Sequence, residues 1–285
     1  MIIDNVITES LNNRQYLRAD VKVQGDKWKR VFFAVSNKYS NYVYYDSSPF
    51  LASFLLPAMK QKEDITVKGI ISSKVSRSIE AVSELVSSWR TGFYKVQVNV
   101  PNARPDGAHP TAVGCFFTGG VDSFYTFLKH RSEITHLIII HGCDIPLKDK
   151  EFFSIALDTV KKVAAETKIK VIVVESNYRE VIEPLLEWEW ELGSALSAVA
   201  LFLRNGFKKI YIPGGMKYDQ LCPYGTHPDL DPLWSSERLK IVHDGCEFSR
   251  LEKVMHSISK SSLALRHLRV CCYILKGKYN CNNCF

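Results

Sequence analysis

The sequence lacks any run that approaches the roughly 20 consecutive apolar residues needed to cross a bilayer. Its start, Met1-Ile2-Ile3-Asp4, also lacks the basic segment and apolar core of a secretory signal. We therefore expect a cytoplasmic protein with no membrane partner. In that setting its eight cysteines are predicted to be buried thiols, metal ligands or catalytic groups rather than disulfides.

Internal repeats and low-complexity tracts are missing as well. Apolar residues make up 46% of the chain and charged residues 24%, which are ordinary values for a globular protein and exclude a disordered or fibrous one. A chain of 285 residues can form one large domain or two smaller ones. We predict a small α+β domain over 1–108, a nucleotide-binding α/β domain over 109–260 and a cysteine-containing tail over 261–285.

The net charge of +7 is unevenly distributed along the chain. Counting Lys and Arg against Asp and Glu gives +5 for 1–110, −3 for 111–256 and +5 for 257–285. Because basic side chains supply nonspecific affinity for nucleic acids, an RNA partner would contact the two flanks. A solvated basic surface without such a partner is the favoured interpretation.

The first hundred residues mix two kinds of pattern. Segments rich in β-branched and aromatic residues predict strands, and apolar residues at helical spacing predict helices. The strands are expected at 16–23, 30–35, 41–45 and 93–100, and the helices at 49–59 and 76–89. Three prolines and a glycine within 101–110 predict a linker.

From Thr111 onward, short apolar runs alternate with helical patterns, which predicts a doubly wound, mostly parallel sheet. Ligands bind such sheets at the carboxyl ends of the strands. The expected strands are 113–117, 136–140, 171–174 and 210–212, and the expected helices are 121–130, 150–167 and 193–205.

The strongest motif is Thr118-Gly119-Gly120-Val121-Asp122-Ser123, which follows a predicted strand and begins a predicted helix. Paired glycines allow the backbone to turn tightly, and the unpaired amides at the start of a helix attract anions. The motif is neither a Walker loop, which needs a Gly-Lys-Ser/Thr, nor the dinucleotide fingerprint, which needs a third glycine. The alternative is a Gly-Gly turn that starts a helix and binds nothing.

Other strand ends supply further candidates for nucleotide contacts, namely His141, Gly214 and Gly215. For His141 a simple hydrogen bond to a neighbouring carbonyl is an equally good interpretation. After Met216 a long connection with three prolines predicts a substrate loop, with Lys217 as a catalytic candidate and Asp219, His227 and Asp229 as substrate contacts. Proline turns with Asx caps are its structural alternative.

The tail contains Cys271, Cys272 and a Cys281-Asn-Asn-Cys284 pair, a spacing typical of tetrahedral zinc sites. Adjacent cysteines bind one ion together poorly, so we predict Cys272, Cys281 and Cys284 as the ligands. A fourth ligand is then missing from the tail, and free thiols are the alternative.

The Thr118–Ser123 loop resembles the Ser-Gly-Gly-x-Asp-Ser loop of the PP-loop ATP pyrophosphatases, with Thr118 in place of the leading serine. Residues 111–285, about the last three-fifths of the chain, are similar to 7-cyano-7-deazaguanine synthase and its relatives. Besides the loop, the parallels are the 193–205 helix before a glycine-ended strand, the His227-Pro228-Asp229 tract and the tail cysteines. The approaches to the substrate differ, with His141-Gly142-Cys143-Asp144 where the family has a Gly-Gln-Arg-His type sequence.

This resemblance implies a HUP/PP-loop fold and the cleavage of ATP to AMP and pyrophosphate. The expected ligands are ATP, Mg²⁺ and, in the tail, Zn²⁺; Thr118 to Ser123 would hold the phosphates, with Asp122 and Ser123 among the catalytic residues. We expect adenylation of a small-molecule acceptor, followed by displacement of AMP by a nucleophile such as ammonia. A tRNA-modifying enzyme of the thiolation type and a non-catalytic nucleotide-binding partner protein are the alternatives, and a homodimer is left open.

Overall fold

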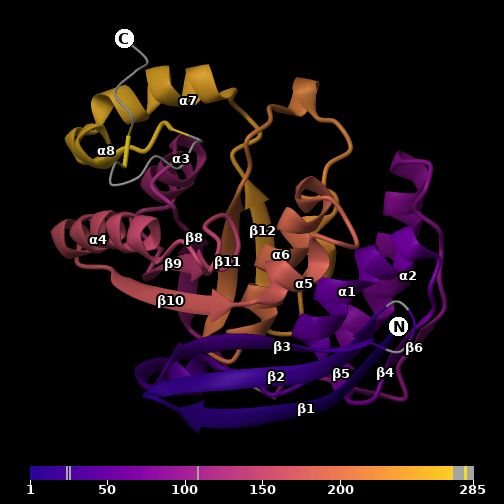
Figure 1. The fold of residues 1–285 in the computed structure, drawn as a ribbon. Coiled ribbons are helices and arrows are strands. Elements are labelled where there is room, and N and C mark those ends of the chain that lie inside the picture. The colour runs from indigo at the N-terminus through magenta and orange to yellow at the C-terminus, as the bar shows by residue number, and fades with distance from the viewer. Residues whose placement is uncertain (24, 26, 108, 272–278, 281–285) are drawn as a thin grey trace.

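The structure is a computed structural model that describes residues 1–23, 25, 27–107, 109–271 and 279–280. Ten of the described strands form a sheet in the order β12-β11-β8-β9-β10-β3-β2-β1-β4-β6, with helices on both faces (Figure 1), and β5 and β7 form a separate two-stranded sheet. Six of the nine neighbouring pairs in the ten-stranded sheet are parallel and three are antiparallel. The predicted α/β class with a mostly parallel sheet is therefore confirmed.

The elements follow one another along the chain as a β-rich first part and an alternating second part. The strands are β1 (Ile2–Leu11), β2 (Arg14–Val23), β3 (Lys27–Ser36), β4 (Ile65–Val67), β5 (Ile70–Ser72), β6 (Val98–Asn99), β7 (Asn102–Arg104), β8 (Ala112–Phe116), β9 (His136–His141), β10 (Lys170–Ser176), β11 (Phe207–Pro213) and β12 (Lys240–Asp244). The helices are α1 (Ser48–Gln61), α2 (Ser73–Trp89), α3 (Val121–Lys129), α4 (Lys150–Thr167), α5 (Tyr178–Ile182), α6 (Trp188–Phe202), α7 (Arg250–His256) and α8 (Ser262–His267). None of the helices within the described ranges has the length and apolar character to cross a membrane.

The five strands β8 to β12 are all parallel to one another. Numbered from β8, their order across the sheet is 5-4-1-2-3, which is compatible with a Rossmann-like fold. The strand order reverses between β8 and β11, because β9 and β10 lie on one side of β8 while β11 and β12 lie on the other. In open α/β sheets the ligand crevice forms at such a point, outside the carboxyl ends of the strands.

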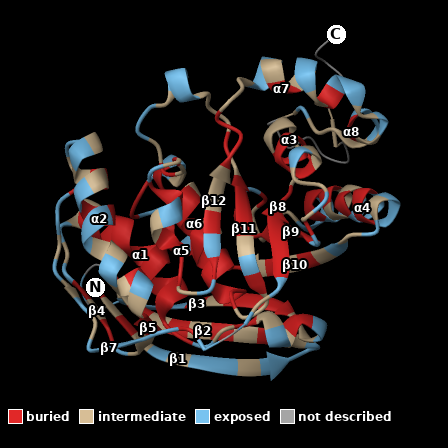
Figure 2. Ribbon diagram, turned by 180° about the vertical axis from the view of Figure 1, so that it is seen from behind, coloured by how far each residue is buried: buried red, intermediate tan, exposed pale blue. Residues whose placement is uncertain are grey.

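The central strands are apolar because helices cover them on both faces. Every residue of β8 and β9 is buried, as expected for parallel strands inside an α/β layer (Figure 2). The core on one face combines side chains of the sheet with α1, α5 and α6. The core on the other face combines them with α3, α4 and α8. Because helices cover both faces of the central strands, the ends of these strands are where a ligand can reach the sheet.

The first hundred residues extend the same sheet. β3 pairs antiparallel with β10, where Phe33, Ala34 and Val35 lie opposite Ser176, Glu175 and Val174. The predicted linker contains β7, which pairs with β5. The division at residue 108 stays a prediction, but the strands before and after it share one sheet and one apolar core.

One predicted strand of the first part is wrong and another is confirmed only in part, and the strands β1, β4, β5, β7 and β12 were not predicted. The predicted strand over 41–45 is instead the end of a 3₁₀ helix, η1 (Asn37–Tyr42), followed by residues outside any helix or strand, and the Tyr42 ring packs against Phe207 at 5.4 Å between ring centroids. Of the predicted strand over 93–100, only Val98–Asn99 pairs. The strands β1 and β12 escaped prediction because polar residues interrupt their apolar pattern.

Candidate functional site

A cavity of about 610 Å³ lies at the carboxyl ends of β8 and β11, where the strand order reverses. Its position is the one predicted for the ligand crevice. The polar side of its wall comes from the loop after β8 and from the ends of the neighbouring strands. The polar and glycine residues that line it are Thr118, Gly120, Asp122, Ser123, Asp144, Gly215, Thr226, His243, Arg250 and Arg269.

The loop after β8 has the conformation that its glycines allow. Gly119 adopts a φ of +77°, in the left-handed region that favours glycine. Gly120 is extended, with φ −76° and ψ 168°, and is the N-cap of α3. The first helical hydrogen bond is donated by Phe124 N to Gly120 O at 2.9 Å, so the amides before it have no partner within the helix. These amides stand at the positive end of the α3 dipole, which favours an anion.

Two basic side chains from α7 neutralise the acidic residue of this loop. The Lys253 amine donates to Asp122 Oδ1 at 3.0 Å and to Gly214 O at 2.6 Å, and its side chain is fully buried. Arg250 Nε donates to Asp122 Oδ2 at 3.0 Å. The site therefore combines the helix amides with two cations, of which the buried Lys253 is held in place by two hydrogen bonds. Asp122, the acidic residue of the loop, is paired with both cations.

A buried histidine forms the β12 side of the cavity. His243 Nδ1 lies 2.7 Å from Asp231 Oδ2, and both side chains are almost completely buried. Burial lowers the pKa of His243, but hydrogen bonds to Asp231 and to Cys246 outweigh it and raise the pKa to about 9. His243 is therefore an imidazolium at neutral pH, with Asp231 as its counterion.

Asp231→Asn is expected to lower the pKa of His243 by about 1–3 units, because the substitution removes the negative charge and keeps the shape. Titration of the histidine ring signals by NMR measures this change. His136 is an internal control. Burial and the charge of Lys170 lower its pKa to about 4, and Asp231 is not among the causes of this shift, so the substitution should leave it unchanged. An unchanged midpoint for His243 in the variant would contradict the ion pair.

The remaining lining of the cavity is mostly apolar. Asp144, just past β9, faces the cavity, where the protein walls around it raise its pKa and the charges of Arg269 and Arg179 lower it. The apolar lining includes Phe116, Leu192, Leu196, Met216, Leu221 and Tyr224. This part of the cavity suits an uncharged group with a hydrogen-bond donor for Asp144.

Most of the predicted phosphate-loop residues reach the cavity, but some predicted nucleotide contacts do not. Gly119 lies beneath the C-terminal segment, because a Cβ there would be 2.0 Å from the Tyr279 hydroxyl. Gly214 packs against His243, where a Cβ would be 2.2 Å from Nε2. His141 lies outside the cavity lining, 3.2 Å from the Pro146 carbonyl and stacked on Phe153 at 4.1 Å. The hydrogen-bonded alternative is the one seen for His141.

The predicted residues of the long connection are also absent from the cavity lining. The Lys217 amine donates to Glu252 at 3.1 Å. Asp219 and Asp229 have 68% and 71% of their side chains exposed to solvent. His227 is buried and packs on Trp89, with 4.6 Å between ring centroids. Among residues 217–229 the connection instead supplies Leu221, Tyr224 and Thr226 to the cavity.

The predicted zinc ligands Cys272, Cys281 and Cys284 lie outside the described residues. Within the described part of the chain, no group of three or more His, Cys, Asp or Glu side chains is placed to hold a metal ion. Cys143 is buried, and its burial raises the pKa of the thiol well above the ordinary value. That thiol is therefore a packing group rather than a reactive one.

Sequence reasoning missed five residues that shape the site: Asp144, His243, Arg250, Lys253 and Arg269. Asp144 had a usable signal, because it is a polar residue just past the end of the buried strand β9. His243 had none, because polar residues interrupt the pattern of β12. Arg250 and Lys253 are spaced i and i+3, which places both on one side of a helix. The position of that helix beside the loop depends on contacts between residues more than 120 apart in sequence.

These features together describe a pocket suited to an anionic ligand in an α/β protein. Comparison of the chain with models of protein families, with curated proteins and with solved structures gives no match.

Proposed function

We propose that this cavity binds ATP and that the protein is an ATP-dependent, AMP- and pyrophosphate-forming enzyme of the HUP/PP-loop type. An oxygen of a small-molecule acceptor would attack the α-phosphate of ATP, forming an acceptor–AMP bond and releasing pyrophosphate. A nucleophile such as ammonia would then displace AMP. The proposal rests above all on one observation: the Gly119-Gly120 loop opens α3 at the reversal of strand order, beside a cavity.

The chemistry of the wall supports a phosphate chain at the loop. Helix amides, Arg250 and Lys253 provide positive charge on the side where pyrophosphate would leave. Gly120 leaves room for close approach, because a Cβ built there meets nothing nearer than 3.9 Å. Thr118 and Ser123 lie in the same wall. Lysine and arginine beside a helix N-terminus are a common combination for binding phosphates.

Asp122 is the loop residue that would hold Mg²⁺ together with phosphate oxygens. Both of its oxygens accept hydrogen bonds from cations, yet each retains a lone pair for a metal, so the residue fits this role. Bound Mg²⁺ would neutralise the charge of the phosphates. Asp122, Lys253 and Gly214 form a chain of hydrogen bonds that keeps the carboxylate in place before any ligand arrives.

The apolar part of the cavity would hold the adenine or the acceptor. Leu192, Leu196 and Tyr224 offer flat, apolar surface, and Asp144 offers an acceptor for an N–H group. The residues predicted as contacts in the 217–229 connection, Lys217, Asp219, His227 and Asp229, are not among the described residues that line the cavity. Specificity for the acceptor is therefore assigned to Asp144 rather than to Asp219, His227 and Asp229.

Gly120→Ala is expected to weaken the binding of ATP·Mg²⁺ on the order of tenfold or more, with little effect on folding. The φ of Gly120 is open to alanine, and the free protein has space for the added methyl group. The methyl group would occupy the place where a phosphate approaches the backbone. Isothermal titration calorimetry measures the affinity, and Gly107→Ala is the matched control because a Cβ there meets nothing within 4 Å. Equal affinity in the two variants would refute phosphate binding at the loop.

Turnover is tested with ATP, Mg²⁺, ammonia and a panel of carboxylic acids, by chromatography of the nucleotide products. We expect AMP and pyrophosphate in equal amounts. Release of ADP without AMP would contradict cleavage at the α-phosphate. Tight binding of ATP without any AMP across a broad panel would support a non-catalytic nucleotide-binding protein instead.

A further inference from the structure

The C-terminal segment is fastened directly onto the phosphate loop. Arg269 N donates to Gly119 O at 2.7 Å, and the Tyr279 hydroxyl donates to Thr118 O at 3.2 Å. Asn280 joins the two parts of the segment, since its side chain accepts from Val270 N at 2.9 Å and donates to Leu268 O at 2.8 Å. Two residues of the loop thus have their carbonyl groups bound by a segment that begins about 150 positions later.

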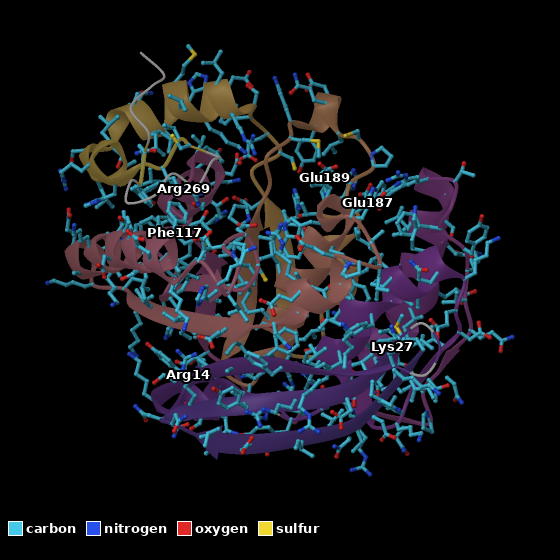
Figure 3. The ribbon with its side chains drawn as sticks, viewed as in Figure 1. Arg14, Lys27, Phe117, Glu187, Glu189 and Arg269 are labelled. Carbon is cyan, nitrogen blue, oxygen red and sulfur yellow. The ribbon has the colours of Figure 1, made fainter. Side chains whose placement is uncertain are left out.

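Arg269, which is labelled in Figure 3, also lines the cavity. Its guanidinium lies over the ring of Phe152, with Cζ 4.9 Å from the ring centroid. Its Nε is buried and has no hydrogen-bond partner among the described residues. A buried donor of a charged group without an acceptor is costly, so an anionic ligand in the cavity would gain a hydrogen bond that the free protein does not make.

Asp144 is the carboxylate whose charge interacts with this guanidinium among the described residues. Arg269 lowers the pKa of Asp144, although burial outweighs this effect and raises the pKa overall. The Arg266 side chain offers a contrast in the same segment, because it is exposed and paired with Glu166. Arg269, by contrast, is held beside the loop by the hydrogen bond from its backbone N to Gly119 O, and its Nε has no hydrogen-bond partner among the described residues.

We propose that Arg269 binds a phosphate group of the ligand, so that the C-terminal segment completes the phosphate site. This inference rests on the proposed function for the identity of the ligand as ATP. A planar guanidinium fits two phosphate oxygens at once, and its charge complements that of Arg250 and Lys253 on the other side of the loop. The loop is then enclosed between two basic elements, α7 and the segment around Arg269.

A thermodynamic consequence follows from this arrangement. The backbone bond from Arg269 to Gly119 and the side-chain bond to phosphate depend on the same placement of the segment. Phosphate binding and docking of the segment therefore strengthen each other by the same factor.

The test compares Arg269→Met and Arg269→Lys with the wild type and with Arg266→Met, the matched control. Three probes are titrated by calorimetry in the presence of Mg²⁺: ATP, adenosine and inorganic pyrophosphate. Arg269→Met is expected to weaken ATP and pyrophosphate by about 10–100-fold and to leave adenosine unchanged. Arg269→Lys should keep part of the affinity, because it keeps the charge and loses the fork, and Arg266→Met should bind like the wild type.

Other outcomes overturn the proposal. Equal losses for adenosine and ATP would indicate a structural role for Arg269, and no loss for any probe would exclude a role in binding. Thermal melting of each variant identifies a folding defect. If Arg269→Met does not fold, Arg269→Lys provides the test, because a folded lysine variant with wild-type affinity for pyrophosphate would refute a requirement for the guanidinium. Wild-type protein that binds pyrophosphate through Arg269 but neither ATP nor adenosine would refute the proposed function and keep the phosphate site. Protein that binds none of the probes would refute both.

Discussion

Arg204→Ala is expected to lower the free energy of unfolding by about 3–5 kcal/mol. The Arg204 side chain is fully buried just after α6, and its guanidinium binds the carboxylates of Asp46 and Asp106. It also stacks on the Tyr44 ring, with Cζ 3.8 Å from the ring centroid. Removing the guanidinium would leave two carboxylates in the interior without a cation. Urea unfolding at pH 7, followed by circular dichroism, measures the change.

Lys95→Ala is the control for this experiment, because its ion pair with Glu84 is exposed on both sides and should contribute less than about 1 kcal/mol. A triple variant with Arg204→Met, Asp46→Asn and Asp106→Asn should be much more stable than Arg204→Met alone, because it leaves no uncompensated carboxylate in the interior. A loss below about 1 kcal/mol for Arg204→Ala would show that solvent reaches the two carboxylates. The same result would mean that the segment around Asp106 is not anchored to the second half of the chain.

Glu191→Gln is expected to abolish a strong pH dependence of stability. Glu191 is fully buried in α6, and this burial raises its pKa from 4.5 to about 8 against a smaller opposite effect of Tyr178. The Tyr178 hydroxyl lies within hydrogen-bond reach of both Glu191 Oε2 and Ser53 O, 2.9 Å from the latter, and its single proton can be donated to only one of them at a time. The folded protein therefore keeps a proton on Glu191 up to about pH 8, whereas the unfolded chain releases it near pH 4.5.

The sign of the effect follows from proton linkage. Between pH 4.5 and 8 the folded state holds more protons than the unfolded state, so stability falls as the pH rises. At about 1.36 kcal/mol per unit of pKa, the fall attributable to Glu191 reaches roughly 5 kcal/mol at most. Urea unfolding of the wild type and Glu191→Gln across pH 5–9 measures the difference. Glu189→Gln, at an exposed position two residues earlier, is the control, and parallel curves for the wild type and Glu191→Gln would refute the neutral carboxyl group.

Much of the second half of the fold followed from local pattern. The apolar runs at β8 and β9 predicted buried parallel strands, and alternation with helices predicted an α/β sheet with its crevice at the strand ends. The Thr118–Ser123 loop lies at that crevice, and the predicted helix over 150–167 has the bounds that the structure shows. These successes share one cause, since each depends on residues adjacent in sequence.

The rest depended on contacts that no local pattern carries. Lys253 meets Asp122, and Arg269 meets Gly119, only after the sheet is assembled. His227 looked like a substrate ligand because it lies in a proline-rich connection, yet packing against Trp89 of α2 occupies its ring. The participation of β3 in the same sheet was invisible for the same reason, because its partner β10 lies more than 130 residues away.

The pairing of β3 with β10 also determines how the protein can be divided in the laboratory. A recombinant fragment that starts after the prolines near residue 110 would retain the residues that line the cavity but leave Val174, Glu175 and Ser176 without the strand that pairs with their backbone. Unsaturated strand edges associate with one another and cause aggregation. Biochemical work on the cavity therefore calls for the intact polypeptide, and random truncation screens should recover soluble products only when the first three strands are kept.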